Sequence, residues 1–228
     1  MEDGLRSKEV SEFLLRACHD LRTPSRTLRT HSELLLKQGE AGWSRSVEER
    51  LAFLVDSARK LDVILEGLVA YSVALQTDPA TFQKVRLDIQ LRAVQVKLAA
   101  ALRECEAAVT AGDLPEVMGQ SERLFLMLEH LVRNSLVHRG EERPRIHLDA
   151  VRENGNWLFT LSDNGPGIEA AYLENVFRPF ERLRRSRNEG AGLGLTICRE
   201  IVQRHGGKIW AEEAQHGARL RFTLAALD

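Results

Sequence analysis

Several features that would place a protein in a specialised class are scarce or missing in this sequence of 228 residues. Its three cysteines, Cys18, Cys105 and Cys198, are odd in number and far apart. They therefore argue against a disulfide framework or a cysteine-based metal site and favour a reducing, cytosolic setting. The formal net charge is −1, which gives no reason to expect a nucleic-acid partner. No apolar run reaches the roughly 18 to 20 residues of a membrane span, and the N-terminus lacks a basic-then-apolar secretory signal. We expect a cytoplasmic chain without a membrane span.

The first third of the chain has the heptad pattern of two long helices. Leucines recur every seven residues in two runs, Leu14, Leu21, Leu28 and Leu35, then Leu54, Leu61, Leu68 and Leu75, with Leu51, Ala58 and Leu65 as a second seam. Such spacing places side chains on one stripe, along which helices pack side by side. Two glycines and a serine within residues 38–44 indicate a turn between them. Because a hairpin buries only one face of each helix, we expect a homodimeric four-helix bundle. The alternative is a hairpin packed on the rest of the same chain.

After residue 75 the pattern changes to mixed helices and strands. Residues 76–86, which include Pro79, have the composition of a linker. Beyond them, helical spacing predicts helices at about 89–104, 121–138 and 193–205, and alternation predicts strands at about 107–110, 146–150, 158–160, 208–212 and 219–224. Asn154-Gly155 is typical of a hairpin turn. The sequence thus predicts an α+β fold with three parts: a helical hairpin over 1–75, a linker over 76–86, and a domain over 87–228 whose sheet carries helices on one face.

Three elements of the second half suit a nucleotide. Asn134 lies on a predicted helix one turn after His130, and its amide oxygen is a hard, neutral ligand suited to Mg²⁺. Asp163-Asn164-Gly165-Pro166-Gly167-Ile168 follows an apolar strand, where the carboxylate can accept a hydrogen bond from an adenine amino group and the glycines let the backbone approach a ligand. Gly190-Ala191-Gly192-Leu193-Gly194-Leu195 leads into a helix whose first N–H groups can hold phosphate oxygens. Each element alone is weak, so their order and spacing carry the hypothesis.

A candidate phosphate acceptor lies in the first predicted helix, within Cys18-His19-Asp20-Leu21-Arg22-Thr23-Pro24. Leu21 occupies the heptad seam, so we expect His19 to lie off the seam and to be exposed. A neutral imidazole is a competent nucleophile, and the adjacent Asp20 can accept or orient the proton on the other ring nitrogen. Thr23, one turn beyond His19, would position a water for removal of phosphate from a partner. The plainer alternative is a surface histidine followed by a helix end at Pro24.

These motifs resemble a known family. Asp-x-Gly-x-Gly, then Phe177 and Phe180, then Gly-x-Gly-Leu-Gly-Leu resembles the ATP-binding domain shared by gyrase, Hsp90, histidine kinases and MutL. His-Asp-Leu-Arg-Thr-Pro resembles the phosphoacceptor box of histidine kinases. Together they cover about residues 10–225, so the whole chain resembles a sensor histidine kinase catalytic core. His19-Asp20, Gly112-Asp113-Leu114-Pro115, the short lid and residues 204–210 resemble the phytochrome-like branch.

The resemblance implies a function and a set of residues. The chain would use ATP and Mg²⁺ to phosphorylate His19 and would pass the phosphoryl group to an aspartate of a response-regulator receiver domain, under control of a sensor domain outside this chain. Residues 181–191 would form a mobile lid that carries Arg182, Arg184, Arg185 and Arg187. The implied catalytic residues are His19, Asp20 and Thr23, and the implied metal ligand is Asn134. The implied nucleotide-binding residues are His130, Asn134, His138, Asp163, Gly165, Gly167, Ile168, Phe180, Gly190, Gly192, Leu193, Gly194 and Leu195.

The sequence departs from the family pattern at several positions. His130 stands where a first Asn is usual, Val137 where a phosphate-contacting Lys is common, and Gln215 replaces a glycine of the final turn, in which Gly217 remains. Ser25 replaces an apolar residue after Pro24. These departures leave two alternatives open: a dimeric ATPase of the same fold that labels no protein, and a dimeric docking scaffold with a degenerate ATP site.

Overall fold

The computed structural model describes residues 17, 20–35, 45–182 and 190–227. The chain divides into two units, Met1–Val69 (unit 1) and Ala70–Asp228 (unit 2). Within the described ranges, no helix combines the length and the apolar character that a bilayer crossing demands. Each unit is considered by itself below.

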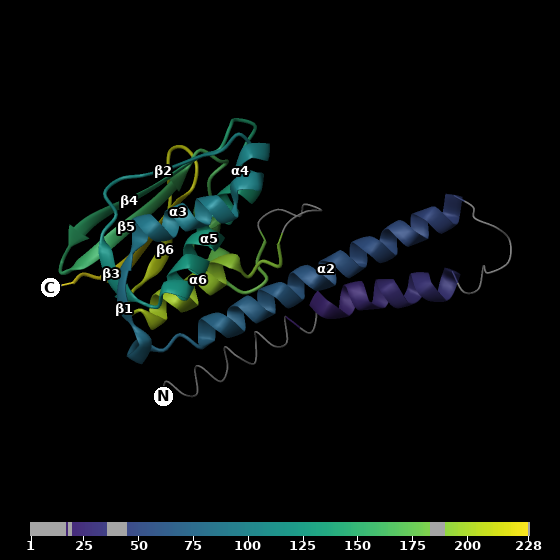
Figure 1. Cartoon of the computed structure of the whole chain (residues 1–228). Helices are drawn as coiled ribbons and strands as arrows, with labels where there is room; N and C mark the ends of the chain where they lie inside the picture. Colours follow the sequence, from purple (N-terminus) through teal and green to yellow (C-terminus); the bar gives the residue numbers. More distant parts are fainter. Residues whose placement is uncertain (1–16, 18–19, 36–44, 183–189, 228) are drawn as a thin grey trace. The chain divides into compact units, whose positions relative to one another are not determined.

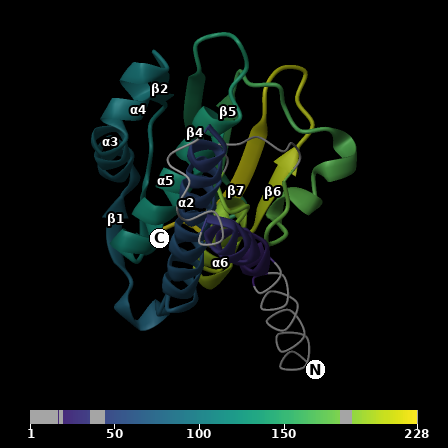
Figure 2. The same ribbon diagram turned by 90° about the vertical axis from the view of Figure 1, so that its right-hand side faces the viewer.

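Unit 1 is built from two long helices, in agreement with the heptad pattern. Residues 20–35 are helical, and α2 (Arg45–Leu75) runs alongside them in the opposite direction (Figures 1 and 2). The rings of His31 and Phe53 stack across the pair with centroids 4.9 Å apart. Ser57 and Ile64 of α2 are buried. The predicted turn at 38–44 lies outside the described residues.

The two predicted seams of α2 differ in burial. Leu54, Leu61 and Leu68 are half-buried, as expected for the contact between the helices. By contrast, Leu65 is 51% exposed, and Val55 and Val69, on the same helical stripe, are 51% and 64% exposed. The hairpin therefore leaves one apolar stripe of α2 without a cover among the described residues.

Unit 2 contains a five-stranded sheet with the strand order β2-β4-β5-β7-β6. Its neighbours pair antiparallel except for β2 and β4, which are parallel. The Asn154-Gly155 turn between β4 and β5 is confirmed, because both residues have the positive φ (52° and 78°) that this hairpin turn requires. The bounds are β2 (Ala108–Ala111), β4 (Arg145–Glu153), β5 (Asn156–Asp163), β7 (Arg219–Ala225) and β6 (Ile209–Glu212).

A second, two-stranded sheet pairs β1 (Gln83–Arg86) with β3 (Glu116–Gly119). Sequence reasoning missed β3, because four residues after a turn are too few to show an alternating pattern. The segment 76–86, predicted as a linker, contains a 3-10 turn, η1 (Pro79–Thr81), as well as β1. Asp78 accepts a hydrogen bond from the Ala80 N–H at the start of η1.

Helices cover one face of the five-stranded sheet, as the sequence predicted, so the domain is a two-layer α/β sandwich (Figure 1). The predicted helix 89–104 is two helices, because the backbone leaves helical geometry at Leu98 (φ −94°, ψ 9°). Between the layers, the rings of Phe159 and Phe222 stack with centroids 4.7 Å apart. The helices are α3 (Leu87–Lys97), α4 (Ala99–Glu104), α5 (Ser121–Val137) and α6 (Gly194–Arg204), and two 3-10 turns, η2 (Ala170–Tyr172) and η3 (Asn175–Phe177), precede α6.

His205 fixes the end of α6 against the start of α5. Its Nε2 accepts a hydrogen bond from the Gln120 N–H (3.1 Å), and its Nδ1 lies 2.8 Å from the Ile201 carbonyl oxygen. Its ring also stacks on Phe82 with centroids 4.4 Å apart. Burial lowers the pKa of His205, which favours the neutral ring that these two hydrogen bonds need. The two helices that carry much of the candidate site are thereby held together.

Candidate nucleotide-binding site

Helix α5 forms the floor of the candidate site. His130, Asn134 and His138 follow one another at one-turn spacing and therefore share a face. A Cβ added to Gly194, the first residue of α6, would lie 3.5 Å from His130 Nδ1. At the other end, a Cβ added to Gly165 would lie 2.9 Å from the His138 carbonyl oxygen. Both glycine segments predicted from the sequence thus approach α5, one at the His130 side chain and the other at the C-terminal end of the helix, and Asn134 lies between these two points along the helix.

Asp163, at the end of β5, has a fixed carboxylate. Its Oδ1 accepts hydrogen bonds from the N–H groups of Gly165 (2.9 Å) and Ala218 (3.0 Å). Its Oδ2 accepts a third from Ser135 Oγ on α5 (2.7 Å). Ser135 is buried, and sequence reasoning missed it. The available signal was a small polar residue directly after Asn134 in an otherwise apolar helix face. The orientation of Asp163 is therefore set before any ligand binds.

Two glycines allow the β5 end to touch the start of β7. Gly217 has φ +70°, and a Cβ there would lie 1.6 Å from the Asp163 carbonyl oxygen. Gly167 has φ +77°, and a Cβ there would lie 2.8 Å from the Gly217 carbonyl oxygen. Only a hydrogen atom fits in place of a side chain at either position. The final turn has Gln215 where the family pattern has a glycine, but it still requires a glycine at position 217.

We expect Gly217→Ala to lower the free energy of unfolding of unit 2 by about 3 kcal/mol or more, through overlap with the β5 backbone in addition to the unfavourable φ. The melting temperature should fall by roughly 10 °C. The matched control is Gly155→Ala, where φ is +78° but nothing lies within 4 Å of the added Cβ. That substitution should cost only about 1 kcal/mol. Equal losses in thermal denaturation of the two variants would show that the close approach at Gly217 is unimportant.

The second glycine segment is held by the residues before the predicted lid. The Phe180 N–H donates to the Gly192 carbonyl oxygen (2.9 Å). Gly192 has φ +73°, and a Cβ there would lie 2.9 Å from the Phe180 carbonyl carbon. Thr196 Oγ1 donates to the Phe177 carbonyl oxygen (3.1 Å), which ties the first turn of α6 to η3. The start of α6, where backbone N–H groups have no helical partner, is thereby placed at the site.

The remaining predicted residues of this segment differ in burial. Leu193 and Leu195 are buried beneath the loop, and Ile168 is half-buried. Gly190 is exposed with nothing within 4 Å of an added Cβ, so the structure does not bring it to the others. Most of the predicted lid, including Arg184, Arg185 and Arg187, lies outside the described residues.

A charge cluster around one buried carboxylate, that of Glu129, lies beside the site. Glu129 is 5% exposed, and its carboxylate accepts hydrogen bonds from Lys97 Nζ (2.7 Å) and Arg133 Nη2 (2.8 Å). Burial acts to raise the pKa of Glu129, but these two hydrogen bonds outweigh it and hold the pKa below its usual value. Glu129 is therefore ionised, and Lys97 and Arg133 balance its negative charge.

Two side chains of this part of α5, His130 and Asn134, have polar atoms without a hydrogen-bond partner among the described residues. Burial lowers the pKa of His130 to about 4, so the ring is neutral near pH 7. His130 Nε2 is buried without a hydrogen-bond partner in the described part of the chain, and within the same residues the Asn134 side chain makes no hydrogen bond. An amide oxygen suits Mg²⁺, so Asn134 fits the expected metal. Val137, which stands where a phosphate-contacting Lys is common in the family, is 40% exposed. The nearby Arg139 donates a hydrogen bond from Nη1 to the Leu136 carbonyl oxygen (2.8 Å).

The predicted catalytic residues belong to unit 1. His19 lies outside the described residues. Asp20 is half-buried and Thr23 is exposed on the helix over 20–35. Pro24 lies within that helix, so the alternative of a helix end at Pro24 is wrong.

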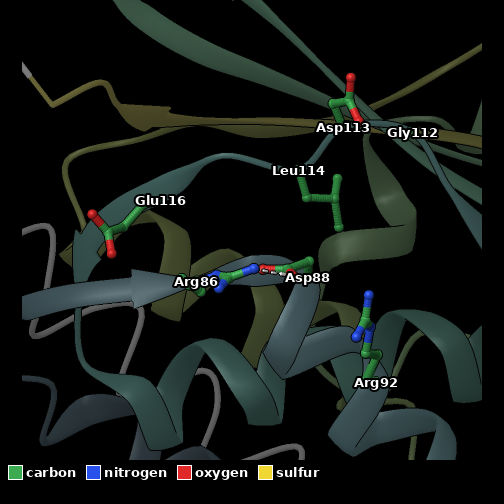
Figure 3. A pocket seen from close by; sticks show the side chains of 7 residues that line it. All are labelled: Arg86, Asp88, Arg92, Gly112, Asp113, Leu114 and Glu116. Atoms are coloured by element: carbon green, nitrogen blue, oxygen red, sulfur yellow. Dashed lines mark hydrogen bonds and ion pairs between the residues drawn. The ribbon is translucent and has the colours of Figure 1, made fainter.

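A hollow of about 530 Å³ lies elsewhere in unit 2, at the start of α3 (Figure 3). Arg86 and Asp88 form an ion pair within it (2.7 Å), with Arg92 and Leu114 beside them. Its lining is mainly charged, unlike the largely apolar walls that hold most small ligands. None of its residues belongs to the predicted nucleotide set, so the contacts around α5, and not cavity size, define the candidate site.

Comparison with known proteins agrees with this geometry. Residues 119–227 match the family described as histidine kinase-, DNA gyrase B-, and HSP90-like ATPase. Cyanobacterial phytochrome A of Nostoc sp. is 31% identical over 218 residues, which cover 95% of this chain and 28% of that protein. The chain thus spans less than a third of that relative.

Solved structures share the fold. The catalytic domain of histidine kinase ThkA superposes with a TM-score of 0.55 at 27% identity, over 63% of this chain and 97% of that chain. The complex of ThkA with response regulator protein TrrA matches with a TM-score of 0.71 at 22% identity, over 97% of this chain and 63% of that chain. Both the helical part and the α/β sandwich therefore have counterparts among known structures.

Proposed function

We propose that this chain, as a member of the sensor histidine kinases, binds ATP in unit 2 and transfers the γ-phosphoryl group to His19. The observation that carries this proposal is the arrangement around α5. Helix α5 meets the start of α6 at His130 and the Gly165 turn at His138, and Ser135 holds the Asp163 carboxylate in place. The helical hairpin, residues 1–75, would carry the phosphoacceptor, and residues 87–228 would carry the nucleotide.

Each part of the site has a role in binding. Asp163 Oδ2 has capacity to accept a hydrogen bond from the adenine amino group, because a carboxylate oxygen accepts more than the one bond from Ser135. The tight turns at Gly165 and Gly167 let the base approach the backbone. The free N–H groups at the start of α6 would hold phosphate oxygens. When bound at Asn134, Mg²⁺ would neutralise phosphate charge and orient the triphosphate.

The proposed reaction is an in-line displacement. A ring nitrogen of His19 attacks the γ-phosphorus, a nitrogen–phosphorus bond forms, and the bond to the β–γ bridging oxygen breaks to release ADP. Asp20 would accept the proton on the other ring nitrogen. The charge of the imidazole is thereby balanced as the phosphoryl group arrives. The reaction requires units 1 and 2 to meet, so we propose that the segment between them permits that approach.

We further propose that the chain acts as a homodimer on a response regulator. The exposed stripe of Val55, Leu65 and Val69 offers an apolar surface that a second hairpin would cover in a four-helix bundle. Phosphohistidine at position 19 would pass its group to an aspartate of a receiver domain, the kind of partner that ThkA has in its solved complex. Thr23, exposed on the helix over 20–35, would position water for removal of phosphate from that partner.

Incubation with γ-³²P-ATP and Mg²⁺, followed by mapping of the label, tests the proposal. The expected result is an acid-labile, base-stable phosphate on the peptide that contains His19. A melting temperature raised by Mg-ATP would accompany it, since a ligand that binds only the folded state stabilises it. ATP turnover without label on the protein would favour the ATPase alternative. The absence of both label and thermal shift would favour the docking scaffold.

A further inference from the structure

We propose that Arg22 of one chain forms an ion pair with Asp62 of a second copy, twice by symmetry, and that these pairs set the alignment of the two hairpins. The inference rests on the homodimer of the proposed function and deepens it, because it names the residues that would select the partner copy. Both residues belong to unit 1, and both are exposed.

Asp62 is the charged position in the exposed apolar stripe of α2. Val55, Leu65 and Val69 of this stripe are 51%, 51% and 64% exposed. Ala58 and Asp62 belong to the same stripe, because the positions follow one another at alternating steps of three and four residues. A carboxylate that is covered by an apolar contact without a cation is costly. A second copy that covers the stripe must therefore bring a positive charge to Asp62.

The hairpin places Arg22 and Asp62 at the same height. His31 stacks on Phe53 across the two helices, which run in opposite directions. Arg22 is nine residues before His31, and Asp62 is nine residues after Phe53. Because both helices rise by about 1.5 Å per residue, these equal separations bring positions 22 and 62 to the same height along the hairpin.

Arg22 and Asp62 also project from the same side of the hairpin. Each directly follows a half-buried leucine of the contact between the helices, Leu21 or Leu61. The next residue of a right-handed helix is turned by about 100°. Since the two helices run in opposite directions, both turns lead to the same side. Among the described residues, neither Arg22 nor Asp62 makes a hydrogen bond or an ion pair, so both charges remain available to a second copy.

A two-fold axis parallel to the helices converts this arrangement into two ion pairs. Such an axis leaves every residue at its height and places the helix over 20–35 of one copy against α2 of the other. In a contact of this symmetry, if residue i meets residue j, then j also meets i. Arg22 of each copy thus faces Asp62 of the other copy, and opposite charges meet at both places.

A two-fold axis perpendicular to the helices gives the opposite result. It places the helix over 20–35 against the same helix of the second copy. Arg29 directly follows Leu28, so this side of the helix carries both Arg22 and Arg29. Like charges would then approach each other, which acts against that arrangement. The Arg22–Asp62 pair therefore favours the parallel alignment, in the way that charged pairs beside a coiled-coil seam set orientation.

Charge-reversed variants of the full chain test the pairing. Asp62→Arg alone would bring like charges together in its own homodimer, and so would Arg22→Asp alone. The dimer dissociation constant of each, measured by analytical ultracentrifugation, should rise at least about tenfold. In an equimolar mixture, only the heterodimer of the two variants regains opposite charges at both places. Heterodimers should therefore outnumber homodimers about tenfold when counted by native mass spectrometry.

The matched control replaces Arg22→Asp by Arg29→Asp in the mixture. Arg29 is on the same side of the same helix, but it lies seven residues, about 10 Å, from the height of Asp62. That mixture should show no such excess of heterodimers. Random pairing in the first mixture, or an equal excess in the control mixture, would overturn the proposal. Random pairing is also the result expected if the two charges met within one chain, because mixing cannot restore an intrachain pair.

These outcomes separate the inference from the proposed function. If the unmodified chain sediments as a monomer, the proposed homodimer is wrong and the ion pair with it. If the unmodified chain is a dimer while the two variants pair at random, only the assignment of Arg22 and Asp62 is wrong.

Discussion

His19→Gln should reduce phosphate incorporation from γ-³²P-ATP to background. Glutamine is of similar size and stays polar, but its amide nitrogen has no available lone pair to attack phosphorus. Nucleotide binding is assigned to unit 2, so the Mg-ATP-dependent rise in melting temperature should be the same as in the unmodified chain. Acid-labile label counted on the purified protein, with the thermal shift measured in parallel, checks both halves of this expectation.

The matched control is His31→Gln, on the helix over 20–35. His31 stacks on Phe53 within the hairpin and has no assigned role in transfer. That variant should keep its label, which would show that a His-to-Gln change in unit 1 is tolerated. Labelling of His19→Gln at the level of the unmodified chain would remove position 19 from the reaction, whatever the nucleotide does in unit 2.

Asp163→Asn should weaken ATP binding about 100-fold without unfolding unit 2. The substituted Oδ1 can still accept from the Gly165 and Ala218 N–H groups, which now bond to Asp163 Oδ1. The amide NH₂ then replaces Oδ2, and Ser135 Oγ can rotate to accept from it, because a hydroxyl is both donor and acceptor. On the side that faces the ligand, however, the NH₂ group of the substituted side chain would replace the acceptor oxygen Oδ2 of Asp163. Two donors would then face each other, the side-chain NH₂ and the amino group of adenine.

Titration of AMP-PNP, together with the melting temperature in its absence, measures the two effects separately. Ser135→Ala is the control, because it removes one hydrogen bond to the carboxylate but leaves the acceptor. Its loss should be smaller, about threefold to tenfold. If Asp163→Asn bound AMP-PNP within threefold of the unmodified chain, Asp163 would not be the residue that reads adenine.

Much of the fold was predictable because its signals are local. The heptads of α2, the Asn154-Gly155 turn and the spacing of α5 each depend on residues a few positions apart. Where the signal was short or ambiguous, prediction failed. Strand β3 has only four residues, and the break at Leu98 interrupts a helical pattern that continues across it. The exposure of Leu65 likewise depends on which stripe of α2 the other helix covers.

The sequence by itself determined which chemistry this protein has available: an imidazole followed by a carboxylate in a helix, an amide one turn from a second imidazole, and glycines where the backbone must turn. These follow from residue type and nearby spacing. Only the tertiary structure decided which groups meet. Ser135 and Ala218 reach Asp163 from 28 and 55 positions away, and Gly194 reaches His130. Those contacts arise from the pairing of β5 with β7 and the packing of α5 on α6, and packing between distant segments leaves no local pattern in a single sequence.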